Sequence, residues 1–215
     1  MKDLIIVIPV LSKNRHFKDG DLKQISGISL VQWKINQMPT LIESYPTYVY
    51  AMEKIDLSSN DDKVRFIERK DESVGSMIAQ LKSMFSKKPV LWVNCNAPFV
   101  NEKTMIDAIS EFEAKKDKYT GLVPVIEDKN FFIYNGGPLN FSLTDELSRI
   151  NNRPLFKVTN SFYMFELDSV QSNLITENSL YYNVSKGDSY ELDSDSSEND
   201  IKNKFIEYLM SKNNN

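Results

Sequence analysis

The first side chains in this sequence that could do chemistry follow its first apolar run, LIIVI. Five of them within the loop 9–23 are cationic or can become so: Lys13, Arg15, His16, Lys18 and Lys23. Lysine and arginine neutralise phosphate oxygens, and the neighbouring Ser12 and Asn14 can donate hydrogen bonds to them. The loop therefore indicates a cradle for a nucleoside triphosphate. Because Gly20 is its only glycine, a solvated charged turn is the alternative.

A second pattern lies near the C-terminus, where the stretch YELDSD places Glu191, Asp193 and Asp195 at alternate positions. Alternate side chains of an extended segment share one face, and carboxylates at that spacing suit a hard divalent cation. Mg²⁺ usually takes one or two carboxylates together with substrate phosphates, so a nucleotide is needed to complete such a site. Without a metal, the stretch is an acidic surface turn.

Polar side chains also lie at two positions where a strand is expected to end and a helix to begin. In DESVGS, Ser73 and Ser76 could contact a base or ribose, or Ser73 could simply cap a helix. In NCNAPF, the amides of Asn94 and Asn96 can both donate and accept hydrogen bonds, as recognition of a base or sugar requires. The alternative is a polar strand exit that binds nothing.

A basic loop and an acidic pair in one chain together favour nucleotidyl transfer. Cationic side chains must hold the β- and γ-phosphates, and Mg²⁺ must neutralise the α-phosphate and the leaving pyrophosphate. The protein otherwise contributes little beyond positioning the reactants.

The elements that would position these residues alternate between short β-branched runs and segments with a helical period. Strands are expected at 3–8, 47–52, 63–69, 89–94, 120–126 and 160–167, with a short strand from Tyr190. Helices are expected at 29–38, 72–85, 101–116 and around Ile201, Phe205 and Leu209. This order predicts an α/β fold, a doubly wound, three-layer α/β/α arrangement with a mostly parallel, mixed central sheet. Ligands then bind outside the carboxyl ends of the strands.

The chain is expected to form a single domain over residues 1–215, with a β-arm excursion at about 128–165. The stretch 130–143 reads as a hairpin around Asn135-Gly136-Gly137. Its aromatic side chains suit an apolar interface with a second copy of the chain. A β-arm folded onto its own core is the alternative.

Composition excludes several classes of function. The net charge of −4 argues against a general nucleic-acid binder. No apolar run approaches the roughly 18 residues of a transmembrane helix, and the N-terminal run is too short for a signal peptide. With Cys95 as the only cysteine and one histidine, an intrachain disulfide is impossible and a zinc site is nearly excluded. We expect a cytoplasmic protein.

Four stretches, in order along nearly the whole chain, resemble the CMP-sugar synthetases, the acylneuraminate cytidylyltransferase family. Residues 4–35 resemble the family's opening strand, I-P motif and G-K-P-L-I-x-W helix entry, with Ile8 and Pro9 on the I-P. Similar matches are VNCNAPFVNEKTMIDAISEF (93–112), SRINNRPLFKVTNSFYMFEL (148–167) and the closing YELDSDSSENDIKNKFIEYL. The chain departs from the family where the first-loop arginine falls on Leu11 and the glycine pair on Ser12 and Lys13.

The resemblance implies a nucleotide-diphospho-sugar transferase-like fold and a reaction in which CTP and an acidic sugar give a CMP-sugar and pyrophosphate, with Mg²⁺. It also implies a homodimer and a role for each candidate residue. Arg15, Lys23 and Asp193 would be catalytic, and Glu191, Asp193 and Asp195 would hold the metal. The nucleotide would be bound by Ser12, Lys13, Asn14, Lys18, Ser73, Ser76, Asn94 and Asn96, and the acceptor by Arg149, Arg153, Asn160 and Tyr163.

Two other functions remain open. The departures in the first loop favour a catalytically silent relative that acts as a scaffold or regulatory subunit. Alternatively, the chain is a cytidylyltransferase whose acceptor is a phosphorylated alcohol or a phosphonate.

Overall fold

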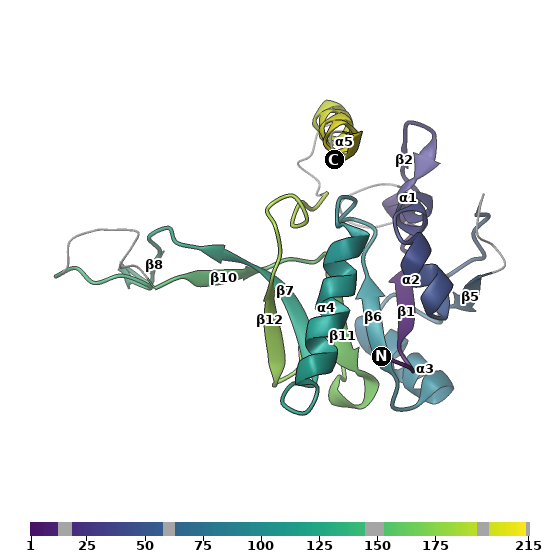
Figure 1. Ribbon diagram of the computed structural model, residues 1–215, viewed down its shortest axis with the longest axis horizontal. Helices are drawn as coiled ribbons and strands as arrows, with labels where there is room; N and C mark the ends of the chain where they lie inside the picture. Colours follow the sequence, from purple (N-terminus) through teal and green to yellow (C-terminus); the bar gives the residue numbers. More distant parts are fainter. Residues whose placement is uncertain (13–18, 58–62, 145–152, 193–197, 214–215) are drawn as a thin grey trace.

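The structure, a computed structural model, describes residues 1–12, 19–57, 63–144, 153–192 and 198–213, and is drawn in Figure 1. Its centre is an eight-stranded sheet in the order β10-β7-β11-β6-β1-β4-β5, with β12 also paired to β7. The strands are β1 (Ile5–Pro9), β4 (Thr47–Ala51), β5 (Val64–Glu68), β6 (Pro89–Val93), β7 (Gly121–Asp128), β10 (Leu155–Val158), β11 (Phe162–Glu166) and β12 (Ser179–Asn183). β1, β4, β5 and β6 are parallel, whereas β11 runs antiparallel to β6 and β7, so the sheet is mixed and mostly parallel, as predicted.

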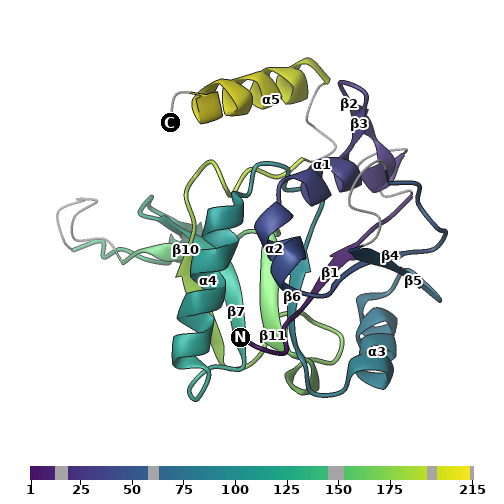
Figure 2. The ribbon, with the colours of Figure 1, turned by 45° about the vertical axis from the view of Figure 1, so that its right-hand side comes forward.

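Helices cover the two faces of this sheet: α1 (Leu30–Asn36), α2 (Pro39–Ser44) and α4 (Glu102–Lys115) on one, and α3 (Val74–Phe85) on the other. The last helix, α5 (Glu198–Asn213), lies beyond the ends of the strands, at the top of Figure 1. Alternate residues of β1 enter different cores: Ile6 and Ile8 pack with α1, α2 and α4, and Ile5 and Val7 pack with α3. Figure 2 shows α4 and α3 on either side of the strands. The continuous apolar run at the N-terminus is therefore a strand buried on both faces.

Local signals in the sequence place the helix starts. The side chains of Ser29, Ser73 and Asn101 accept hydrogen bonds from backbone N–H groups in the first turns of α1, α3 and α4. These caps satisfy amides that have no partner inside a helix, which confirms the predicted starts.

Three elements differ from the expectations. The helix predicted over 29–38 ends at Asn36, and Pro39 instead begins α2, where its fixed φ suits the first helical position. The short strand expected from Tyr190 is wrong for residues 190–192, because Leu192 donates its N–H to the carbonyl of Asn96 in a loop, outside any sheet ladder. Strand β12 was not expected.

The β-arm extends from β7 and β10, which pair antiparallel, to a hairpin of β8 (Ile133–Tyr134) and β9 (Gly137–Pro138). Asn135 and Gly136 have φ of 49° and 80°, the left-handed pair that a tight hairpin turn requires. Buried Asn140 ties the arm together by donating to the carbonyls of Asn130 and Arg153. The arm projects from the body of the molecule in Figure 1.

Two short pieces connect β1 to α1: a 3-10 turn, η1 (Gly20–Leu22), and a hairpin of β2 (Gln24–Ile25) and β3 (Ile28–Ser29). A second 3-10 turn, η2 (Leu167–Ser169), follows β11. Within the described ranges, no helix combines the length and hydrophobicity needed to cross a bilayer.

Candidate functional site

A cavity of about 590 Å³ opens where β1, β5 and β6 end. Its walls come from six parts of the chain: Pro9, Leu11 and Asp21; Arg69 and Glu72; Val74 and Met77; Trp92, Asn94, Cys95 and Asn96; Asn160 and Tyr163; Leu174 and Leu192. A volume of this size is typical of a small-molecule site, and the carboxyl edge of a parallel sheet is where α/β proteins bind ligands. The position therefore agrees with the expectation from the sequence.

Arg69, which the sequence analysis did not select, is the most unusual residue of this cavity. It follows β5 and is only 3% exposed. Its Nη1 donates to the carbonyl of Val10 at 3.2 Å and its Nε to the carbonyl of Asp71 at 3.1 Å. Its Nη2 is buried and has no hydrogen-bond partner among the described residues. Burial lowers the pKa of Arg69, an effect that nearby Glu72 opposes.

A buried donor without a partner costs free energy unless a ligand or water accepts from it. Arg69 lines the cavity, so its Nη2 is a candidate donor to a bound molecule. The sequence carried one signal for this residue, an arginine placed immediately after a strand that ends at the ligand-binding edge.

Asp21 supplies a buried carboxylate to the same cavity. Its Oδ2 accepts from the N–H of Leu11 at 2.8 Å, and its own N–H donates to the Leu11 carbonyl at 2.7 Å. Burial raises the pKa of Asp21 to about 6, although the bond from Leu11 and the charge of Arg69 act in the opposite direction. The cavity therefore contains one buried cation and one buried acid.

The Asp21 carboxyl makes stability depend on pH. Its pKa lies at about 6 in the folded protein against an ordinary 3.8, so the folded state holds the proton more tightly. The stability that this provides is complete below pH 3.8 and is lost as the pH rises through 6, about 3 kcal/mol in all. We expect Asp21→Asn to remove this dependence, since asparagine still accepts from Leu11 but does not ionise.

Urea unfolding of both proteins between about pH 4 and pH 7.5 measures the effect. The variant should gain stability over the wild type as the pH rises. Asp19→Asn, which changes an exposed neighbour, is the matched control and should show no such trend. A difference between wild type and Asp21→Asn that stays constant with pH would contradict the assignment.

Four of the predicted site residues form one hydrogen-bond network at the cavity. Asn94 donates its side-chain N–H to the carbonyl of Asn160 at 2.7 Å and accepts from the indole of Trp92. The carboxylate of Glu191 accepts from both the backbone and the side-chain N–H of Asn160. Tyr163 donates its hydroxyl to Asn160 Oδ1 at 2.6 Å, and burial raises the pKa of this tyrosine to about 12.

The network orients Asn94, whose amide bonds both the Trp92 indole and the Asn160 carbonyl. An amide has a second N–H and a second oxygen lone pair, so contact of Asn94 with a base or ribose stays a prediction. Asn96 also lines the cavity, and its amide can both donate and accept.

The remaining predicted residues lie in several places. Ser73 caps α3 by accepting from the N–H of Ser76, next to cavity residues Val74 and Met77. Ser12 and Lys23 line a second hollow, of about 610 Å³. Arg153 lies on the arm, where its N–H donates to the Asn140 carbonyl, and it does not line the main cavity. Lys13, Asn14, Arg15, His16, Lys18, Arg149, Asp193 and Asp195 lie outside the described residues.

Comparisons with known proteins identify the architecture. Two solved structures of 4-diphosphocytidyl-2C-methyl-D-erythritol synthase superpose on this chain, one of them from Anaerococcus prevotii. That one is 10% identical with a TM-score of 0.62, covering 96% of this chain and 99% of its own. The other is 12% identical with a TM-score of 0.62, covering 98% of this chain and 100% of its own.

A third structure, CMP:2-keto-3-deoxy-manno-octonic acid synthetase complexed with CTP, is 8% identical with a TM-score of 0.62 and covers 98% of this chain and 99% of its own. The fold is that of nucleotide-diphospho-sugar transferases. No family profile matches the sequence, and no curated protein matches it. The shared architecture includes known cytidylyltransferases, but it does not single out the acylneuraminate family that the sequence resembles.

Proposed function

We propose that this protein is a cytoplasmic cytidylyltransferase that activates an acidic sugar, using CTP and Mg²⁺ and releasing pyrophosphate. The observation that carries the proposal is the buried Arg69 in the wall of a cavity at the carboxyl edge of the sheet, with an Nη2 that has no hydrogen-bond partner among the described residues. The structurally similar CMP:2-keto-3-deoxy-manno-octonic acid synthetase is complexed with CTP, which supports the same nucleotide here.

In this proposal the cavity holds the base and ribose. Arg69 donates from Nη2 to an acceptor atom of the base, and the amide of Asn96 meets the base or ribose with both its donor and its acceptor. The triphosphate extends toward the first loop, where Lys13, Arg15, Lys18 and Lys23 hold it. The acceptor sugar lies beside Asn160 and Tyr163, and its carboxylate pairs with Arg149 or Arg153, because a planar guanidinium matches a carboxylate bidentately.

The carboxylate oxygens of Glu191, which lies beside Asn160, suit a hard cation. Each oxygen of the Glu191 carboxylate accepts one hydrogen bond from Asn160, which leaves further lone pairs on both oxygens. Within the part of the chain that the structure describes, no group of three metal-binding side chains occurs, and the predicted partners Asp193 and Asp195 lie outside it. Glu191, Asp193 and Asp195 would hold Mg²⁺, which, when bound, neutralises charge on the α-phosphate and the pyrophosphate.

One observation favours a catalytically silent relative. The N–H of Leu11, at the start of the first loop, is already engaged by the Asp21 carboxylate and is therefore not free to bind a phosphate oxygen. Isothermal titration with CTP and Mg²⁺ separates the two functions, since an absence of binding at millimolar nucleotide would leave only the silent one. Pyrophosphate release across acidic sugars, phosphorylated alcohols and phosphonates then identifies the acceptor.

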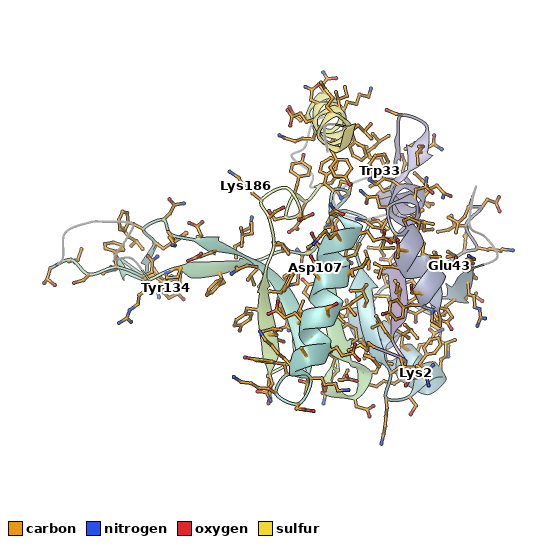
Figure 3. The ribbon with its side chains drawn as sticks, viewed as in Figure 1. Lys2, Trp33, Glu43, Asp107, Tyr134 and Lys186 are labelled. Carbon is orange, nitrogen blue, oxygen red and sulfur yellow. The ribbon has the colours of Figure 1, made fainter. Side chains whose placement is uncertain are left out.

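We further propose that the arm joins two copies of the chain in a homodimer. A two-stranded ribbon is marginally stable by itself, yet this one exposes large apolar side chains, among them Ile133 at 71% and Tyr134 at 67%. Tyr134 lies on the arm far from the body in Figure 3. On the adjoining sheet, Phe156 and Tyr181 are exposed and stacked with ring centroids 6.3 Å apart, which extends the apolar surface.

The dimer is tested by replacing Ile133 with aspartate. We expect this change to raise the dimer dissociation constant by about 10-fold or more, because a charge buried in an apolar interface is strongly unfavourable. Analytical ultracentrifugation measures it. Lys157→Asp, a larger change of charge at an exposed position of β10, should leave the dimer intact. A wild-type protein that sediments as a monomer at micromolar concentration would rule the arm interface out.

A further inference from the structure

We propose that Lys34 is a positioning residue that fixes the loop after β6 and so orients the amide of Asn96 in the cavity. Lys34 lies on α1 and is fully buried, with 0% of its surface exposed. Its Nζ donates to the carbonyl of Ala97 at 2.6 Å. It does not line the cavity, so it acts through the loop.

The loop is held along one edge at three successive carbonyls. The carbonyl of Asn96 accepts from the N–H of Leu192 at 2.8 Å, that of Ala97 from Lys34, and that of Pro98 from the indole of Trp33 at 2.7 Å. Two of these donors are neighbouring side chains of α1. The ring of Trp33 packs edge-on against that of Phe205 in α5, with centroids 4.6 Å apart. Figure 3 shows Trp33 below α5.

The opposite edge of the same loop faces the cavity, where Asn94, Cys95 and Asn96 form part of the wall. Since residues 94–98 belong to no helix or strand, these three bonds take the place of a regular backbone ladder. The position of Asn96 therefore depends in part on Lys34 and Trp33, which do not line the cavity.

Packing alone does not account for a lysine at this position. The buried neighbours of Lys34 on α1 include Val31 and Ile35, and an apolar residue of similar volume would complete that face. Burying an ammonium group is costly unless strong hydrogen bonds compensate for it, and replacing a buried charge with an apolar side chain is often neutral or stabilising. The bond to the Ala97 carbonyl is a property that an apolar side chain cannot supply.

The same loop links two parts of the proposed site. Asn96 lines the cavity, while its carbonyl accepts a hydrogen bond from the N–H of Leu192, the residue before Asp193. Lys34 therefore sets the position of the nucleotide wall and of the chain leading into the acidic segment. This inference rests on the proposed function for its effect on CTP, but its structural part does not.

The test uses Lys34→Met, which keeps the volume and removes the donor. We expect the Leu192 amide to exchange with solvent about 10-fold faster, and KM for CTP to rise about 10-fold with kcat changed less than about threefold, the scale of one lost charged hydrogen bond. Ser29→Ala is the matched control, because it weakens the cap of α1 without touching the loop. It should leave both the Leu192 exchange and KM at their wild-type values.

Equal exchange at Leu192 in Lys34→Met and Ser29→Ala, with equal KM, would overturn the inference. If the wild type does not bind CTP at all, the proposed function fails, and the Leu192 exchange alone decides the role of Lys34. Should Lys34→Met not fold, Lys34→Gln serves instead, since its shorter neutral side chain also removes the hydrogen bond to the Ala97 carbonyl. The same exchange criterion applies to it.

Discussion

Replacing Arg69 with methionine is expected to raise the dissociation constant for CTP by about 10- to 150-fold. The guanidinium has one buried donor, Nη2, without a partner among the described residues, and Arg69 lines the cavity. A hydrogen bond from a charged group contributes about 1.5–3 kcal/mol, and every 1.4 kcal/mol is a factor of ten. Isothermal titration with CTP measures the change directly.

Arg65→Met provides the matched control for this prediction. Arg65 lies on the same strand, β5, but its side chain is exposed, so its loss changes the net charge equally without altering the cavity. Arg69→Lys should also bind weakly, because an ammonium cannot bond both the Val10 carbonyl and a ligand in the geometry of a planar guanidinium. Identical affinities for Arg69→Met and Arg65→Met would show that the nucleotide does not occupy this cavity.

Replacing Asp193 with asparagine is expected to lower the rate of cytidylyl transfer by roughly 100-fold or more, since a metal-held charge contributes several kcal/mol to such a transition state. Folding should be unaffected, because the change keeps the size of the side chain. Removal of Mg²⁺ with EDTA should abolish turnover of the wild type, and added Mg²⁺ should restore it. Pyrophosphate release measures both effects.

Asp168→Asn, an exposed carboxylate in η2, is the control and should retain full turnover. Glu191→Gln is the informative third variant, because Glu191 binds Asn160 with both oxygens. If Glu191 both binds the metal and accepts the hydrogen bonds of Asn160, this variant should require a higher Mg²⁺ concentration for its half-maximal rate. Wild-type turnover in Asp193→Asn would remove the acidic segment from the proposed metal site.

The positions of helices and strands were predictable because their causes are local. Ser29, Ser73 and Asn101 each stand one residue before a helix and cap it through bonds to amides two or three residues away. The turn at Asn135 and Gly136 needs only two residues that tolerate a positive φ. Apolar runs mark the central strands equally well, because burial on both faces excludes polar side chains.

The candidate site could be located only to an edge of the sheet. The sequence selected Asn94 and Asn160 for separate roles, yet they hydrogen-bond to each other across 66 residues of chain. The sequence did not identify Arg69, because the Val10 carbonyl to which it donates is 59 residues away along the chain. Such contacts follow from the strand order, which brings the ends of β1, β5 and β6 to one side of one cavity.

By itself, the sequence determined the class of fold, the edge of the sheet at which the cavity lies and the residue types available there, because periodicity and capping depend on neighbouring residues. Only the tertiary structure decided which charged side chains are buried. Lysine and aspartate usually lie on the surface, yet the side chains of Lys34 and Asp21 are buried. The free energy of burying a charge depends on partners from distant segments, here the Ala97 carbonyl for Lys34 and the Leu11 amide for Asp21.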